Sequence, residues 1–433
     1  MRDGLVARLK VGRDQIRLRR LSLSLDALRQ GAWLFVVSVI GGGFHYLANA
    51  AIGRMLPPSD YSVYTSLLSL TLILSAVTTV IETVTTNYVA RLRAAGQMEN
   101  VGALLLYLLR QLLPWGALGV VLLWLLGRLL ARVLRLPSAV PVWVMATVLV
   151  PVVALPVLQG GLRGLERFRA FGINVIGLAA LRLGFGVGLI LVGWGAVGAV
   201  ASLPLSNLGA VILALIWLTS ILRSRKRTFK PDLSGILRYT SYAVAGLFAF
   251  TLLTNMDVVI VKSRFAPDEA GLYSAISTIG KITLYLPLAA ATLLLPKVAV
   301  LNARREYTVH LLRKALWIVG GLCGTVMLAF FLFPSQIVRL LFGAGYLTWA
   351  SLLGPYGLAM TFYSLGNVWL AYYLALGARR YPYALLCVAI VQAVMLFALP
   401  LSLPQIVAAL IAGGVVLNLL GWRFLSTYDE SCR

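Results

Sequence analysis

The chain has 433 residues, of which 60% are hydrophobic and 12% charged, and its mean hydropathy is +0.90. This composition excludes a soluble globular domain, because apolar stretches long enough to cross a bilayer can be marked along nearly the whole length. A formal net charge of +24 would indicate nucleic-acid binding in a soluble protein, but in a membrane protein it indicates basic cytoplasmic loops beside anionic lipid.

Residues 1–30 are basic, and leucines recur among them at helical spacing, at Leu18, Leu21, Leu25 and Leu28. The pattern predicts an amphipathic helix on the cytoplasmic face of the membrane, and the alternative is a disordered basic tail. Because no small-residue cleavage site follows the first apolar run, we expect no cleaved signal peptide.

The hydropathy pattern then predicts an all-α integral membrane protein with about twelve membrane-spanning helices. The predicted spans are residues 31–52, 62–88, 101–127, 138–158, 172–194, 197–221, 239–261, 271–297, 311–333, 347–375, 382–401 and 404–425.

The distribution of basic residues predicts the orientation of these spans. With the N-terminus in the cytoplasm, only seven of the 38 Lys and Arg fall in the loops on the opposite side. Four more fall within spans, at Arg110, Arg182, Lys281 and Lys297. By the positive-inside rule, we expect a multi-pass protein of the cytoplasmic (inner) membrane with both termini cytoplasmic.

An internal repeat divides the chain into two halves. Residues 54–64, RMLPPSDYSVY, are echoed by residues 264–273, RFAPDEAGLY, and an offset of 209 aligns Pro58 with Pro267 and Tyr64 with Tyr273. We therefore predict two six-helix lobes, with parallel repeats around a central cavity. The predicted divisions are the N-terminal segment (1–30), the N-lobe (31–221), a basic cytoplasmic linker (222–238), the C-lobe (239–425) and a cytoplasmic tail (426–433).

Three cations, Arg110, Arg182 and Lys281, lie about ten residues into their spans, roughly 14 Å from the span end and so near the bilayer midplane. A charge at this depth usually faces a cavity or a partner, and a cavity with these cations suits a phosphate or pyrophosphate head. The alternative is structural pairing, for example of Glu82 with Arg110. Asp257 is open to three interpretations: a helix cap, an ion pair or the site of a coupling ion.

Other polar residues and a set of aromatic residues also give predictions. Asn255 and His45 also lie within spans, and a lone histidine is more often a packed interface residue. A set of aromatic residues is predicted to anchor the protein at the outer membrane interface: Tyr61, Tyr64, Trp115, Trp124, Trp143, Tyr273 and Trp349. No cysteine spacing indicates a disulfide framework or zinc, and no P-loop is present, so we expect no cofactor, no metal and no nucleotide hydrolysis by that motif.

Three stretches resemble a known family. NMDVVIVKSRFAPDEAGLYSA (255–275) with LPLAAATLLLPKVA (286–299), LQGGLRGLERFRAFGINVI (158–176) and AIGRMLPPSDYSVYTSLLSL (51–70) are similar to segments of polysaccharide-transport flippases. These flippases belong to the multidrug/oligosaccharidyl-lipid/polysaccharide exporter superfamily. The resemblance covers about residues 30–425.

The resemblance implies a MATE-like exporter fold with a V-shaped cavity between the lobes. It implies alternating access that moves a polyprenyl-pyrophosphate-linked oligosaccharide to the outer leaflet, beside a polysaccharide polymerase and glycosyltransferases. Ser62 departs from the family, which usually has Gly there, and twelve spans are fewer than the fourteen of many relatives. The first span offers His45 and no arginine, which disfavours a peptidoglycan precursor as substrate.

Two alternatives remain at this point. A cation-coupled multidrug antiporter of the same superfamily would favour an acidic or neutral cavity, whereas the mid-span residues here are basic. An integral-membrane glycan polymerase or ligase would need a large outer loop with catalytic groups, and the predicted outer loops are short. The sequence therefore favours a transporter over an enzyme.

Overall fold

The computed structural model describes residues 33–223, 234–285 and 308–432. The predicted N-terminal segment (1–30), Lys297 and most of the predicted linker lie outside these residues. The described residues are helical almost throughout and contain no strand, so the prediction of an all-α fold is confirmed.

The N-terminal half begins with a helix at Trp33–Met55, which we call the first helix. It is followed by α2 (Pro58–Ala94), α3 (Met98–Val133), α4 (Val140–Ala146), α5 (Leu149–Gly164), α6 (Phe168–Leu191) and α7 (Gly195–Arg223). Pro58 occupies the first turn of α2, where the missing N–H has no intrahelical partner to lose.

The C-terminal half repeats the plan. It contains α8 (Ser234–Arg264), α9 (Pro267–Gly280), α10 (Ile282–Tyr285), α12 (Val309–Leu332), α13 (Pro334–Leu341), the 3-10 helix η1 (Ala344–Leu352), α14 (Leu353–Leu376), α15 (Arg380–Ala398) and α16 (Leu403–Cys432). Pro267 opens α9 as Pro58 opens α2. Among the described residues, ten helices are long and apolar enough to cross a membrane. Of the other two predicted spans, 271–297 lies partly outside the described residues, and 347–375 corresponds to α14, which is not among the ten.

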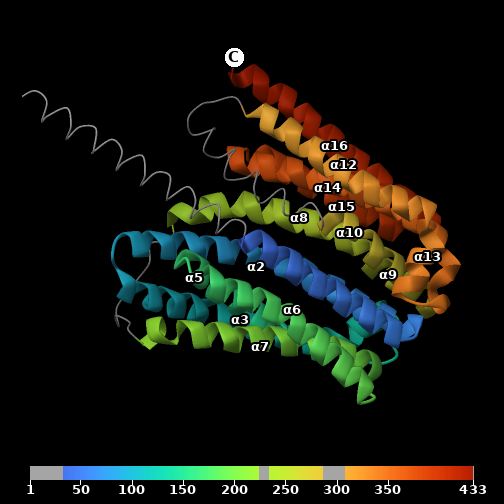
Figure 1. Cartoon of the computed structure of the whole chain (residues 1–433), viewed down its shortest axis with the longest axis horizontal. Coiled ribbons are helices and arrows are strands. Elements are labelled where there is room, and N and C mark those ends of the chain that lie inside the picture. Colours follow the sequence, from blue (N-terminus) through green and yellow to red (C-terminus); the bar gives the residue numbers. More distant parts are fainter. Residues whose placement is uncertain (1–32, 224–233, 286–307, 433) are drawn as a thin grey trace, which may run out of the picture.

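The two halves form two lobes that meet along α2. In the N-lobe, α2 packs against α5, and α6 packs against α7; in the C-lobe, α14 packs against α12 and α16, and α8 against α15. Across the boundary, α2 packs against α8 and α9. Figure 1 shows the N-lobe below and the C-lobe above, with α2 and α8 between them.

The lobes touch at the two turns that the sequence repeat identified. We call this the hairpin end of the molecule: it carries the turn between the first helix and α2 and the turn between α8 and α9. There Thr65 Oγ1 donates to Ser274 Oγ at 2.8 Å, and these two residues are repeat equivalents at the offset of 209. Gly271 lies so close to Pro58 that a Cβ atom would overlap its carbonyl. The repeat axis therefore passes through a contact between the lobes.

Further hydrogen bonds join the lobes at the same end. They include Tyr61 OH with Thr278 Oγ1 (2.9 Å), Lys262 Nζ to Ser62 Oγ (2.7 Å), Tyr346 OH to Leu56 O (2.9 Å), Arg54 Nη1 to Leu340 O (3.3 Å) and Arg135 Nη1 to Arg264 O (3.0 Å). These bonds close the lobes against each other at the hairpin end, which the sequence predicts to face outward.

The expectation that the aromatic set anchors the protein in the membrane interface is wrong for three members. Tyr61, Tyr64 and Tyr273 are fully buried, because their helices face the other lobe or the lobe interior rather than lipid. Trp115 and Trp124 are exposed, as an interfacial anchor requires.

A disulfide tests the closed hairpin end. In a background with the three native cysteines replaced by Ser, we expect Thr65→Cys with Ser274→Cys to cross-link on mild oxidation, because their hydroxyl oxygens are 2.8 Å apart. After proteolysis at a site inserted in the linker, the lobes should stay together on a non-reducing gel. Thr65→Cys with Ser277→Cys is the control, since Ser277 bonds Tyr356 inside the C-lobe and should not cross-link. Separation of both pairs would contradict the contact.

Candidate polar centres within the lobes

The N-lobe encloses a cation, Arg182, which is 7% exposed. Its Nε and Nη2 donate to Tyr64 OH at 3.2 and 2.6 Å, and Nη2 also donates to Asn49 Oδ1 at 3.0 Å. Nη1 lies 3.3 Å from Nδ1 of His45. Because a guanidinium can only donate, His45 Nδ1 must be an unprotonated acceptor in this contact. We call these four residues the Arg182 cluster.

Close packing of the first helix on α6 and α2 assembles this cluster. Gly186 lies against Ile52, and Gly172 lies against Trp33 and Val37, so small residues on α6 admit the first helix. The Arg182 guanidinium also lies 5.7 Å from the centre of the Tyr64 ring. Among the described residues no carboxylate comes within 4.0 Å of Arg182, so neutral groups alone hold its charge.

The C-lobe encloses an anion, Asp257, which is 1% exposed. Its Oδ2 accepts hydrogen bonds from Tyr273 OH at 2.9 Å and Tyr356 OH at 2.8 Å. Since Tyr356 uses its only hydrogen here, Ser277 must donate in its 2.7 Å contact with Tyr356 OH. The other oxygen, Oδ1, is buried without a partner among the described atoms. Within the described part of the chain, Asp257 therefore keeps one acceptor oxygen without a donor.

Lys281 lies beside this anion, in the break between α9 and α10. It is 8% exposed, and its Nζ donates to Asn255 Oδ1 at 3.2 Å. Asn255 is two residues before Asp257 on α8, and Asp257 acts on Lys281 through its charge although no ion pair within 4.0 Å forms. The structure thus brings Asn255, Asp257 and Lys281 together, as three of the predicted site residues.

The repeat-equivalent tyrosines serve the two centres with opposite polarity. Tyr64 OH accepts from the Arg182 cation, whereas Tyr273 OH donates to the Asp257 anion. A phenol can do both. The two lobes thus place charges of opposite sign beside repeat-equivalent tyrosines.

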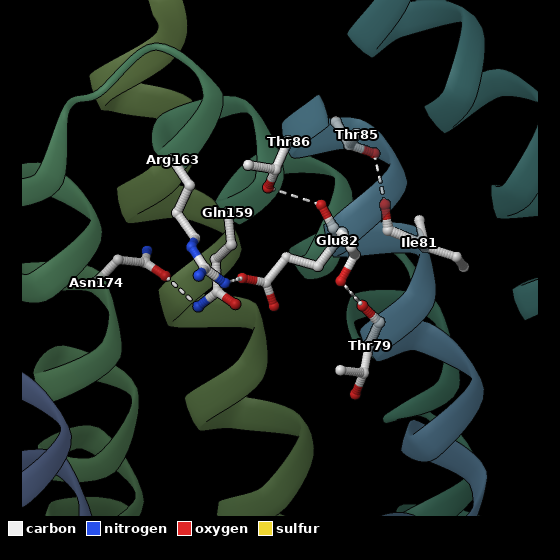
Figure 2. Close-up of polar contacts among 9 residues, drawn as sticks. Thr79, Ile81, Glu82, Thr85, Thr86, Gln159, Arg163 and Asn174 are labelled. Carbon is white, nitrogen blue, oxygen red and sulfur yellow. Dashed lines mark hydrogen bonds and ion pairs between the residues drawn. The ribbon is translucent and has the colours of Figure 1, made fainter. Parts of the chain in front are cut away.

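The structure does not gather all three predicted cavity cations into one group. Arg110 is exposed on the face of α3 opposite to Leu108 and Leu109, which pack inside the N-lobe, and it makes no hydrogen bond or ion pair with the described residues. The proposed pairing of Glu82 with Arg110 is wrong. Glu82 Oε1 instead lies 2.8 Å from Arg163 Nη1 on α5 (Figure 2).

Two glycines of α5 explain this pair. Cβ atoms at Gly160 and Gly164 would lie 2.7 Å from backbone carbonyls of α2, so only glycine lets α5 approach closely enough. Beside it, Gln159 Nε2 donates to Asn174 Oδ1 at 2.8 Å, as Figure 2 shows. Sequence reasoning missed Arg163 because the predicted span ended at residue 158, whereas α5 continues to Gly164.

No cluster of three or more His, Cys, Asp or Glu side chains suited to a metal ion occurs in the described part of the chain.

A double-mutant cycle tests the Glu82–Arg163 pair. We expect Glu82→Gln and Arg163→Gln to lower thermal stability in detergent with a coupling of about 0.5 to 1 kcal/mol, because Arg163 is partly exposed and screening limits the interaction. The Arg93–Glu166 pair, at 2.7 Å and with both side chains more than a third exposed, is the matched control and should couple less. Zero coupling between Glu82 and Arg163 would show that the pair adds nothing to stability.

Comparison with known proteins identifies the family and the fold of the chain. Residues 27–301 match the family described as polysaccharide biosynthesis protein. No curated protein sequence matches. An inward-facing multidrug resistance MATE family transporter of the MOP superfamily aligns at 16% identity over 91% of this chain and 99% of that chain, with a TM-score of 0.76.

Other solved structures share the fold. An outward-facing MATE family transporter aligns at 17% identity over 93% of this chain and 96% of that chain, with a TM-score of 0.64. A MOP superfamily transporter from Pyrococcus furiosus, whose binding pocket is described as reversed in polarity, aligns at 17% identity over 93% and 96%, with a TM-score of 0.66. The chain therefore belongs to the polysaccharide biosynthesis protein family and is a multi-pass membrane protein with the MATE-like fold.

Proposed function

We propose that the chain is a flippase that moves a polyprenyl-pyrophosphate-linked oligosaccharide across the cytoplasmic membrane for surface or exported polysaccharide. The family match and the exporter fold support a transporter rather than an enzyme. One observation carries the substrate class: Arg182 is a buried guanidinium held only by neutral partners.

An uncompensated cation in a low-dielectric lobe attracts anions over longer distances than a neutralised pair does. Arg182 donates its hydrogen bonds to Tyr64, Asn49 and His45, which are neutral. Phosphate oxygens can replace these acceptors without leaving a buried carboxylate unpaired. The pyrophosphate head of a lipid-linked glycan offers such oxygens. A cationic drug would instead be repelled at this place.

Lys281 is the second proposed phosphate ligand. Its Nζ has two donor positions beyond the bond to Asn255, and no carboxylate of the described residues is in contact with it. Arg110, which is exposed, is proposed to meet the head only at the lobe surface. A pyrophosphate that draws Lys281 away would leave Asp257 without its nearby positive charge.

Asp257 is the proposed site at which cation binding is coupled to substrate transport. Its unpartnered Oδ1 is an acceptor for a cation when Lys281 turns to the substrate. Phosphate binding and cation uptake would then occur together within the C-lobe, which is how one gradient could drive the movement of the other species.

The described conformation is proposed to accept the substrate from the end opposite to the hairpin end. Several hydrogen bonds join the lobes at the hairpin end, and the TM-score with an inward-facing relative, 0.76, exceeds that with an outward-facing one, 0.64. With both termini cytoplasmic, the hairpin end faces outward. Rocking of the lobes about α2, α8 and α9 then exposes the head at the other surface. A polysaccharide polymerase and glycosyltransferases are the proposed partners.

Mass spectrometry of prenyl-linked saccharides in cells tests the proposal. In cells that lack the protein, or that carry Lys281→Ala or Arg182→Gln, we expect the lipid-linked oligosaccharide to accumulate by about tenfold or more. The reason is that a hydrogen bond to a charged group contributes about 1.5–3 kcal/mol and 1.4 kcal/mol is a factor of ten. Resistance of the glycan to a glycosidase added outside spheroplasts would place it in the inner leaflet.

The control is Lys314→Ala, which removes an exposed cation on α12 and should leave the lipid pool at the wild-type level. Equal protein amounts are checked by immunoblot. An unchanged lipid pool in the deletion strain would reject a flippase, and a gain in drug susceptibility there would favour the multidrug antiporter.

A further inference from the structure

A third buried cation, Lys262, lies between the lobes, at a place that the sequence prediction counted as an outer loop. Lys262 is 2% exposed and close to the C-terminal end of α8. Its Nζ donates to Ser62 Oγ, on α2 of the other lobe, at 2.7 Å. Ser62 gives its own hydrogen to Ser59 O at 2.5 Å, so it offers Lys262 a lone pair and nothing more.

The charge of Lys262 is not neutralised by contact. No carboxylate of the described residues lies within 4.0 Å of it, and the acids that act on it through their charge are Asp60 and Asp268, in the first turns of α2 and α9. Burying an ammonium against one hydroxyl is unfavourable. The unfavourable energy exists only while the lobes are together, since Ser62 and Lys262 belong to different lobes.

We propose that Lys262 binds the phosphate of a lipid head when the lobes separate at the hairpin end, and that Ser62 covers it in the closed state. The inference rests on the proposed function for its ligand class, a phosphate carried by a lipid. The hairpin end is the predicted outer end of the protein. Lys262 therefore binds the phosphate on the outer side, where the lipid is released, after the phosphate has left Arg182 and Lys281. Phosphate binding there stabilises the open state by its differential affinity for that state.

The simpler interpretation is a latch, in which the Lys262–Ser62 bond only holds the lobes together. The two interpretations predict different signs. If the bond is a latch, Lys262→Met and Ser62→Gly both favour opening. If Lys262 is a covered anion site, Ser62→Gly favours opening because it leaves a buried charge unpaired, whereas Lys262→Met favours closure because an apolar side chain of similar length packs without that cost.

Distances between spin labels report the opening. Labels at Trp194→Cys and Leu340→Cys lie at exposed positions near the hairpin end, one on each lobe, in a background whose native cysteines are Ser. The full-length protein is placed in phosphatidylcholine nanodiscs. Undecaprenyl pyrophosphate is the substrate-like probe, inorganic pyrophosphate tests the free anion, and discs containing phosphatidylglycerol test an ordinary lipid head.

We expect undecaprenyl pyrophosphate to raise the open-to-closed ratio of the wild type by about threefold or more. Ser62→Gly should raise the ratio without any probe, and Lys262→Met should lower it and abolish the response. Lys262→Arg should keep the response, because it keeps the charge. Lys314→Met, which removes an exposed cation of α12, should behave as wild type.

Three results would overturn the inference: opening in both Ser62→Gly and Lys262→Met, an equal response in wild type and Lys262→Met, or no response to any probe. A response to phosphatidylglycerol alone would assign the site to ordinary lipid and overturn its role in release. The outcome is separable from the proposed function. If Lys281→Ala cells accumulate no glycan while the Lys262-dependent response persists, the proposed flippase function is contradicted and the anion site is supported. If these cells accumulate the glycan and the Lys262-dependent response is absent, the flippase function is supported and the anion site is contradicted.

Discussion

The structure depends on the contact between the two copies of one hairpin. Gly271 lies against the Pro58 carbonyl, and the hydroxyls of Thr65 and Ser274 meet across the repeat axis. A side chain at Gly271 would overlap α2, so this contact sets how closely the lobes approach. The corresponding position in the other copy, Ser62, has a different requirement, because it accepts the hydrogen bond of Lys262. Related flippases usually have glycine at the position of Ser62. In this chain the serine hydroxyl is the hydrogen-bond acceptor of Lys262.

The second constraint is a set of buried cations that contact no carboxylate of the described residues. Arg182, Lys262 and Lys281 are each more than nine-tenths buried, and each is hydrogen-bonded to neutral groups. A chain optimised for stability alone would pair these charges or replace them with apolar residues. Keeping them unpaired is unfavourable in one conformation and favourable in any conformation that offers an anion. This arrangement suits a protein that alternates between two states. The two lobes also differ in charge, because Tyr64 contacts a cation in the N-lobe and Tyr273 contacts an anion in the C-lobe.

Much of the fold was predictable, because hydropathy and positive charge respond directly to the bilayer. Most helix ends lie within a few residues of the predicted span ends, whereas α2, α3, α5 and α16 continue six or seven residues past them. The site was predictable only in part. Asn255, Asp257 and Lys281 are close in sequence or on neighbouring helices, and they do come together. Arg110 and Glu82 do not, since rotation of a helix about its axis decides which neighbour a side chain meets.

The sequence by itself determined the family, the all-α membrane fold and the repeat, because these follow from periodicity, composition and local motifs. Only the tertiary structure decided the partners of the charges: Arg163 for Glu82, the His45–Asn49–Tyr64 group for Arg182, and Ser62 for Lys262. The sequence predicted Lys262 in an outer loop, whereas the structure shows it buried at the boundary between the lobes. The physical reason is that burial and pairing depend on how the helices rotate and cross, which is set by small-residue contacts between segments far apart in the chain.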